Sequence, residues 1–115
     1  MADKSFLTWP FFEDHHRTLA TALDTWATQS LVNIDHSDTD AACRALVSAL
    51  GDGGWLEHAA VDHHGVSKLD VRSLCLIRET LARHDGLADF SFAMQGLGTG
   101  AISLFGTDQQ KAEWH

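Results

Sequence analysis

Residues 89–105 read DFSFAMQGLGTGAISLF, and Asp89 is the single charged residue among them. Apolar residues recur in this stretch at steps of four and three, a spacing typical of one face of an α-helix. The residues on that face are Phe90, Met94, Leu97, Ala101 and Leu104. The stretch therefore predicts a nearly uncharged helix from Asp89 to Phe105, and a helical fold around it.

The segment GLGTGA, residues 96–101, also fits the G-x-G-x-x-G/A fingerprint of dinucleotide-binding proteins, and residues 90–94 alternate as a strand would. That fingerprint requires a βαβ unit and an acidic residue about 20 positions further on, and the sequence shows neither. In a helix, each of the three glycines costs about 1 kcal/mol relative to alanine. A neighbouring helix or a ligand close to the backbone would explain that cost, and the sequence leaves both explanations open.

Helical spacing continues through most of the chain before this stretch. A first helix is predicted to open near Pro10 and to run to about Leu31, because proline suits a first helical turn. A second helix is predicted to open at the capping residues 37–40 and to end at Gly51. Its apolar face would carry Cys43, Leu46, Val47 and Leu50.

The remaining two helices are predicted from capping boxes. One box spans Ser67–Asp70 and opens a helix, and the other pairs Thr107 with Gln110 after a stop at Gly106. The buried stripe of the helix after Asp70 would consist of Val71, Leu74, Ile77 and Leu81. No strand is predicted, so the fold class is all-α, an up-and-down bundle of about five helices.

The chain has 115 residues, a size typical of one domain, and its net charge is −8. This charge repels phosphate groups and anionic lipid, so we expect no binding to nucleic acid or to a membrane surface. No apolar run approaches the length of a membrane-spanning helix, about 18–20 residues, so we expect no membrane insertion. Cys43 and Cys75 fall within apolar helical patterns and are predicted to be buried thiols in a reducing compartment. The N-terminus shows no secretory signal, and we therefore expect a cytoplasmic protein.

Eight histidines raise the question of a metal site. The candidates are His15, His16, His58, His63 and His64, with Asp14 and Asp62 as oxygen ligands. Adjacent helical residues point about 100° apart, and His58 and His63 lack the i, i+4 spacing of a helical zinc motif. We therefore expect solvated histidines and no metal site. No nucleophile motif surrounds any serine or cysteine, so no catalytic residue is expected within this chain.

Three segments resemble the N-terminal helical domain of the acyl-CoA dehydrogenase family. They are LCLIRETLARHD at 74–85, QGLG at 95–98 and LFGTDQQK at 104–111. The run LFGTDQQKAEW, residues 104–114, is the most specific, because it joins a helix end, a turn and the next helix in a fixed register. A weaker similarity is the segment FEDHHR at 12–17. The resemblance covers essentially the whole chain.

This resemblance implies an FAD-dependent oxidoreductase that desaturates the α,β carbon–carbon bond of an acyl-CoA thioester. Residues 1–115 would be the N-terminal domain, and the family's middle β-domain and C-terminal helical domain would be absent from them. Those later domains supply the catalytic base and most flavin contacts, so the chain alone is expected to be inactive and to bind no FAD. The expected partners are acyl-CoA, the remaining domains or a complementary subunit, and further copies in a homo-oligomer when the enzyme is complete.

The resemblance also implies a role for residues 89–105, which would form part of the pocket for the acyl chain. Carried over by register, Phe90, Ala93 and Leu97 would line that pocket, with Met94 and Ala101 close by. Without the later domains, the apolar surface around Leu97 and Ala101 would be uncovered and would favour a partner. Two other functions stay open, namely a non-catalytic helical interaction module and a small nucleotide-binding protein.

Two departures from the family pattern accompany this resemblance. The segment VDHHG, residues 61–65, stands where the family usually has a glycine-rich, acidic turn, and His115 stands where an apolar residue usually follows.

Overall fold

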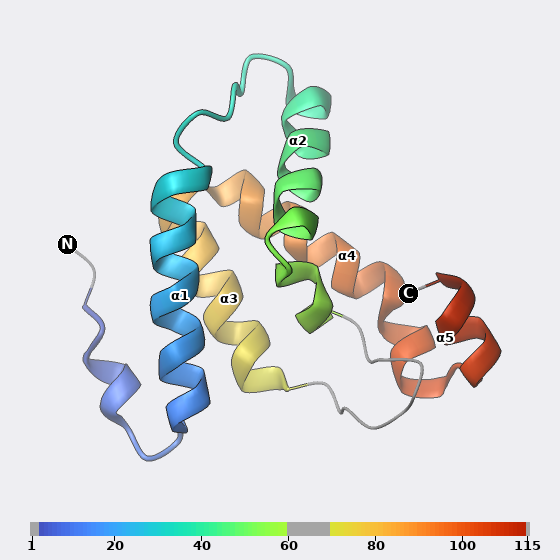
Figure 1. Ribbon diagram of the computed structural model, residues 1–115, viewed down its shortest axis with the longest axis horizontal. Helices are drawn as coiled ribbons and strands as arrows, with labels where there is room; N and C mark the ends of the chain where they lie inside the picture. The colour runs from blue at the N-terminus through green and yellow to red at the C-terminus, as the bar shows by residue number, and fades with distance from the viewer. Residues whose placement is uncertain (1–2, 60–69, 115) are drawn as a thin grey trace.

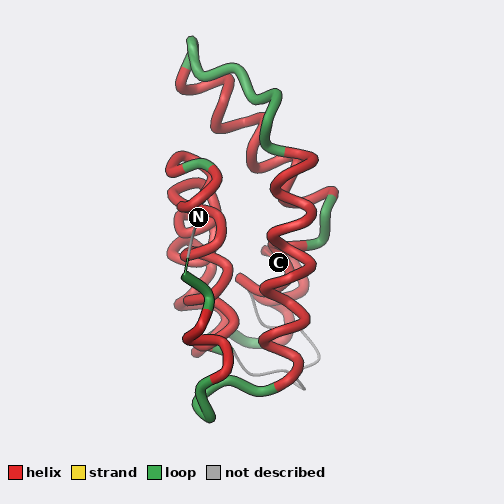
Figure 2. Tube along the Cα trace, turned by 90° about the vertical axis from the view of Figure 1, so that its left-hand side faces the viewer, coloured by secondary structure: helices red, strands yellow, loops and turns green. Residues whose placement is uncertain are grey.

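The computed structural model describes residues 3–59 and 70–114, and every regular element in these ranges is a helix (Figures 1 and 2). The α-helices are α1 (Asp14–Ser30), α2 (Thr39–Asp52), α3 (Val71–His84), α4 (Gly86–Phe105) and α5 (Asp108–Trp114). Two short 3-10 helices, η1 (Ser5–Thr8) and η2 (Trp55–Ala59), complete the described part. The prediction of an all-α fold with about five helices is confirmed.

Helix α4 contacts more elements than any other helix of the described ranges. It packs against α2, α3, η2 and α5, whereas α1 packs on the far side of α3 (Figure 1). The bundle is therefore flat, measuring 43 × 41 × 18 Å along its principal axes, and Figure 2 shows its narrow side.

The core lies between α1, α2, α3 and α4. Its largest fully buried apolar side chains are Leu23, Leu46, Leu50, Ile77, Leu81 and Phe92. Burial of each such side chain stabilises the fold by about 1.5–3 kcal/mol relative to exposure. Because Phe92 extends from α4 into this cluster, one face of α4 is committed to the core.

The first helix begins one turn later than the sequence predicted. Pro10 lies in the turn between η1 and α1, and α1 begins at Asp14. A capping box fixes this start, because the side chains of Glu13 and His16 each accept a hydrogen bond from the other's backbone N–H. A capping box with histidine in place of Glu or Gln was not recognisable from the usual motif.

Helices α2 and α3 each begin after an aspartate whose carboxylate accepts backbone N–H bonds. Asp38 caps α2, as the sequence predicted, and Asp70 caps α3. The capping box predicted for α3 also involves Ser67, which lies outside the described residues. The predicted capping box of α5 is confirmed, since Thr107 N donates to Gln110 Oε1 at 3.0 Å and Gln110 N donates to Thr107 Oγ1 at 3.2 Å.

The buried stripe of α3 was only partly predicted. Ile77 and Leu81 are fully buried, Leu74 is half-buried, and Val71 is exposed. The buried face turns toward Leu76 and includes the polar residues Ser73 and Thr80, which an apolar pattern does not reveal.

The prediction of buried thiols was wrong for Cys75, which is exposed on α3, and Cys43 is half-buried. Cys75 is exposed because the buried face of α3 lies on the side of Ile77 and Thr80.

Helix α4 also begins at Gly86, earlier than the predicted Asp89, because Asp85 caps it by accepting the Leu87 N–H at 2.9 Å.

Asp24 on α1 joins three parts of the described chain. Its carboxylate accepts hydrogen bonds from Lys4 Nζ and from His84 Nε2 on α3, both at 2.6 Å. The hydrogen bonds from Lys4 and then His84 lower the pKa of Asp24 from 3.8 to about 2. The ionised carboxylate is therefore stabilised more in the folded chain than in the unfolded one.

We predict that the folded chain loses stability in acid when the Asp24 carboxylate is protonated. Because the folded pKa is the lower one, the stabilisation is complete above about pH 4 and is lost as the pH falls from about 4 to about 2. Asp24→Asn should lower the free energy of unfolding at pH 7 by about 1–2 kcal/mol and flatten its pH dependence in that window. Urea unfolding between pH 2 and 7 measures this. Asp52→Asn, at the exposed end of α2, is the control, and equal acid profiles for both variants would refute the assignment.

Candidate functional site

Helix α4 carries apolar residues on two opposite faces. Phe92 is buried, whereas Phe90 is 57 % exposed and Leu97 is 74 % exposed. Of the five residues that the family resemblance assigned to the acyl pocket, four are exposed and Ala93 is half-buried. The register of an α-helix places all five on one side, away from the core. The structure thus brings together on one surface the residues chosen from the sequence.

We call this surface the outer face of α4. It consists of the exposed residues Phe90, Met94, Leu97, Ala101, Leu104 and Phe105, with Ala93 at its margin. The one charged residue of α4, Asp89, is bound by Arg78 of α3 at 2.8 Å, and this bond raises the pKa of Arg78. The outer face therefore presents apolar side chains and no charge.

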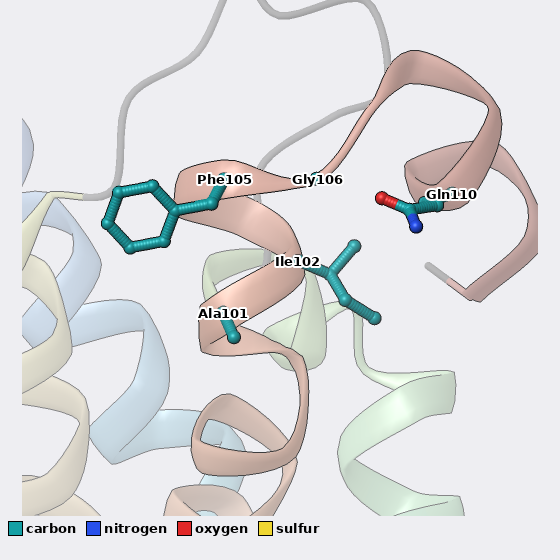
Figure 3. A pocket seen from close by; sticks show the side chains of 5 residues that line it. All are labelled: Ala101, Ile102, Phe105, Gly106 and Gln110. Carbon is teal, nitrogen blue, oxygen red and sulfur yellow. The ribbon is translucent and has the colours of Figure 1, made fainter.

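A hollow lies at the end of the outer face, where α4 meets α5. It has a volume of about 220 Å³ and is lined by Ala101, Ile102, Phe105, Gly106 and Gln110 (Figure 3). Figure 3 shows the ring of Phe105 extending to the opposite side of Gly106 from the Gln110 amide. Because Thr107 N donates to Gln110 Oε1, the amide is fixed at the rim. The sequence had placed only Ala101 in a site here, since the rest depends on the angle between the two helices.

The three glycines of residues 96–101 have different surroundings. A Cβ added at Gly96 would meet Ala59 of η2 at 3.8 Å, an ordinary contact, whereas one added at Gly98 or Gly100 would meet nothing within 4 Å. Packing within the described part of the chain therefore does not require glycine at Gly98 or Gly100. The alternative of close helix–helix packing explains at most Gly96.

The dinucleotide fingerprint is a false match. Residues 90–105 lie within α4, and residues 90–94 form no strand. In a helix interior the backbone N–H groups bond to carbonyl groups four residues earlier, so those of residues 96–101 are not free to hold a pyrophosphate. The same geometry excludes this segment as a cradle for the phosphates of FAD, and it excludes a small nucleotide-binding protein that uses residues 96–101 for its phosphates.

The histidines near the start of α1 are not simply solvated. His16 is fully buried, its Nδ1 accepts the Glu13 N–H at 3.0 Å, and its Nε2 lies 2.9 Å from Asp70 Oδ2. His15 Nε2 lies 3.1 Å from the same oxygen. Burial would raise the pKa of Asp70, but hydrogen bonds from His15, Ser73 and His16 outweigh it and hold that pKa well below 3.8.

The sequence prediction of surface histidines was therefore wrong for His16. The rings of His15 and His16 lie closer than adjacent helical positions suggest, 3.9 Å from centroid to centroid, because the His16 ring folds back into the capping box. His58 is exposed, as predicted, and His63 and His64 lie outside the described residues, as does the departure at residues 61–65.

Comparison with known proteins identifies the class of this helical domain. A family model described as "Acyl-CoA dehydrogenase, N-terminal domain" matches residues 13–115. The chain therefore belongs to the acyl-CoA dehydrogenase family and represents its N-terminal domain. No curated protein matched the sequence. Among the described helices, none combines the length and the apolar character needed to cross a membrane.

We predict that Gly98→Ala stabilises the chain by about 1 kcal/mol, because alanine favours the helix and the new methyl group meets open space. Chemical unfolding followed by circular dichroism measures this change. Gly53→Ala is the contrasting variant, since its Cβ would lie 2.8 Å from Trp26 Nε1 and from Trp55 Cδ1, and it should destabilise the chain. A destabilised Gly98→Ala variant would show that the outer face of α4 is covered within this chain.

Proposed function

We propose that the outer face of α4 forms one wall of the acyl-chain pocket of an FAD-dependent acyl-CoA dehydrogenase. The observation that carries this proposal is a contiguous apolar, uncharged surface that the described part of the chain leaves exposed. Exposed apolar patches of this kind mark binding or interaction sites. Membership of the family supports the choice of an acyl-CoA thioester as the ligand.

The dimensions of the outer face suit an extended hydrocarbon chain. At about 1.5 Å per residue, the path from Phe90 to Ala101 is about 16 Å long. Each methylene group removed from water along it contributes about 0.8 kcal/mol to binding. Gly98 and Ala101 have small or no side chains, so a tail can lie close to the helix backbone in the last part of this path.

The proposed role is binding, and this domain carries out none of the chemistry. In the family, flavin accepts a hydride from the substrate when it is bound. Residues 96–101 cannot hold the phosphates of FAD, and the family resemblance places most flavin contacts and the catalytic base in the later domains, so we assign both to other domains or to a complementary subunit. In our proposal, α4 excludes water from the acyl tail and sets its depth. Assembly into a homo-oligomer is part of the same proposal.

The same surface favours a second candidate, a non-catalytic helical module that binds another protein. Phe105, which is 86 % exposed at the end of the outer face, favours this alternative. A protein partner would cover Phe105 and Leu104 together with Leu97. An acyl tail would instead depend on the narrower path through Ala93, Leu97 and Ala101.

We predict that Ala93→Trp and Leu97→Trp, introduced into the flavoenzyme that contains this domain, shift its preference toward shorter acyl groups. The added indole occupies space along the tail, so the ratio of kcat/KM between long and short substrates should fall by about 10-fold or more. Steady-state kinetics over a chain-length series measures this ratio. Leu97 is the safer position for folding, because it is the more exposed of the two.

The matched control is Ala22→Trp, which adds the same ring on the exposed side of α1. It should leave the chain-length profile unchanged. An unchanged profile in the Leu97 variant, with loss of a protein complex instead, would replace the acyl-pocket proposal by the interaction module.

We also predict that the purified 115-residue chain contains no flavin, because residues 96–101 cannot hold its phosphates and the family resemblance assigns most flavin contacts to other domains. Absorption spectroscopy before and after incubation with FAD measures this. A flavin band that copurifies with the chain would contradict the assignment of the flavin contacts to other domains.

A further inference from the structure

A small hollow lies between the N-terminal segment, α1 and α3, and the acyl-pocket proposal makes no use of it. Its volume is about 20 Å³. Residues of all three parts line it, among them Phe6, Leu7, Ala20, Thr21, Leu76 and Thr80. All of its lining residues belong to these parts of the chain, so the hollow is separate from the outer face of α4.

Thr80 is the lining residue that points to a ligand. Its side chain is 1 % exposed, and its Oγ1 has no hydrogen-bond partner among the described residues. Burying a hydroxyl without a hydrogen bond costs free energy, and most buried hydroxyls in folded proteins have a partner. A group that can bond to Thr80 Oγ1 is therefore expected inside the hollow.

Other helical threonines of this chain satisfy their hydroxyls locally, and Thr80 does not. Thr25 Oγ1 donates to the Thr21 carbonyl at 3.1 Å, and Thr28 Oγ1 donates to the Asp24 carbonyl at 2.8 Å. A threonine in a helix can take either of two rotamers, and such a bond to the preceding turn is one of the reasons. Thr80 makes no such bond to the preceding turn of α3.

The size and the lining of the hollow fit one water molecule. A site needs about 10–15 Å³ of such volume to hold a water, and no larger ligand fits in about 20 Å³. Polar side chains also line the hollow, namely those of Lys4, Thr21, Glu79 and Arg83. Arg83 Nε binds Glu79 Oε1 at 3.0 Å, and the carboxylate keeps acceptor capacity for a further bond.

We propose that this hollow binds one ordered water molecule, which is hydrogen-bonded to Thr80 Oγ1 and joins α3 to α1 and the N-terminal segment. Buried waters typically make about three hydrogen bonds to polar groups that lack other partners. The N-terminal segment benefits most from such a bridge, because η1 has no buried residue. Polar contacts hold this segment, such as Lys4 Nζ to Asp24 and Arg17 Nε to the Leu7 carbonyl, both at 2.6 Å.

The first test is Thr80→Val, which removes the hydroxyl and nearly preserves the shape of the side chain. If Oγ1 is bonded to a water, the variant loses that bond, and its unfolding equilibrium constant in urea should rise by about 5-fold. If the hydroxyl has no partner, the change relieves a buried polar group and stabilises the chain. Thr18→Val, on the exposed side of α1, is the control for the helix propensity of valine and should change little.

The second test detects the water directly and needs no variant that folds. Water-selective NMR of the parent chain should show cross-relaxation between a bound water and the Thr80 methyl group. The same spectrum of Thr80→Val should lose this signal.

A Thr80→Val variant at least as stable as the parent chain would overturn the proposal, and so would a parent spectrum without a bound water at Thr80. Neither experiment needs flavin or acyl-CoA, so both outcomes are independent of the function proposed for α4.

Discussion

The structure depends on a helix that is apolar on two opposite sides. The inner side of α4 fixes the fold, because Phe92 and Ala88 are buried among residues of the other helices. A helix at a protein surface normally turns polar residues to water on its other side. In α4 that side holds Phe90 and Leu97 instead. Each must therefore be exposed at a cost or covered by something outside the described residues.

Aspartates at the N-termini of helices connect distant segments of the chain through hydrogen bonds. Asp85 caps α4 and also accepts a bond from His36 Nε2 at 2.7 Å, so it ties the segment before α2 to the start of α4. Asp70 does the same for α3 and His16. In both cases one carboxylate satisfies free backbone N–H groups of a helix and binds a histidine about 50 residues away along the chain. Much of the histidine content of the protein thus belongs to its internal framework.

The sequence predicted the helices well because their signals are local. Periodic apolar residues and capping motifs gave α2, α4 and α5 nearly at their observed bounds. The prediction from sequence failed where contacts between distant segments decide which side chains are buried. The burial of His16 depends on Asp70 and on a capping box outside the usual motif, and the exposure of Cys75 depends on which face of α3 meets α1 and α4. The outer face of α4 was found because helical register alone aligns its residues, whereas the hollow beside Gln110 requires the angle between α4 and α5.

Two glycines of α4 give a second reason to expect a binding partner at its outer face. Gly98 and Gly100 lower helix stability by about 1 kcal/mol each, and no contact within the described chain requires them. They lie on either side of the path from Leu97 to Ala101, where apolar side chains face outward. Small residues beside exposed apolar ones form a shallow surface that a ligand or another element can approach closely. The loss of helix stability and the exposed apolar area thus occur at one place, and a binding partner at the outer face would explain both.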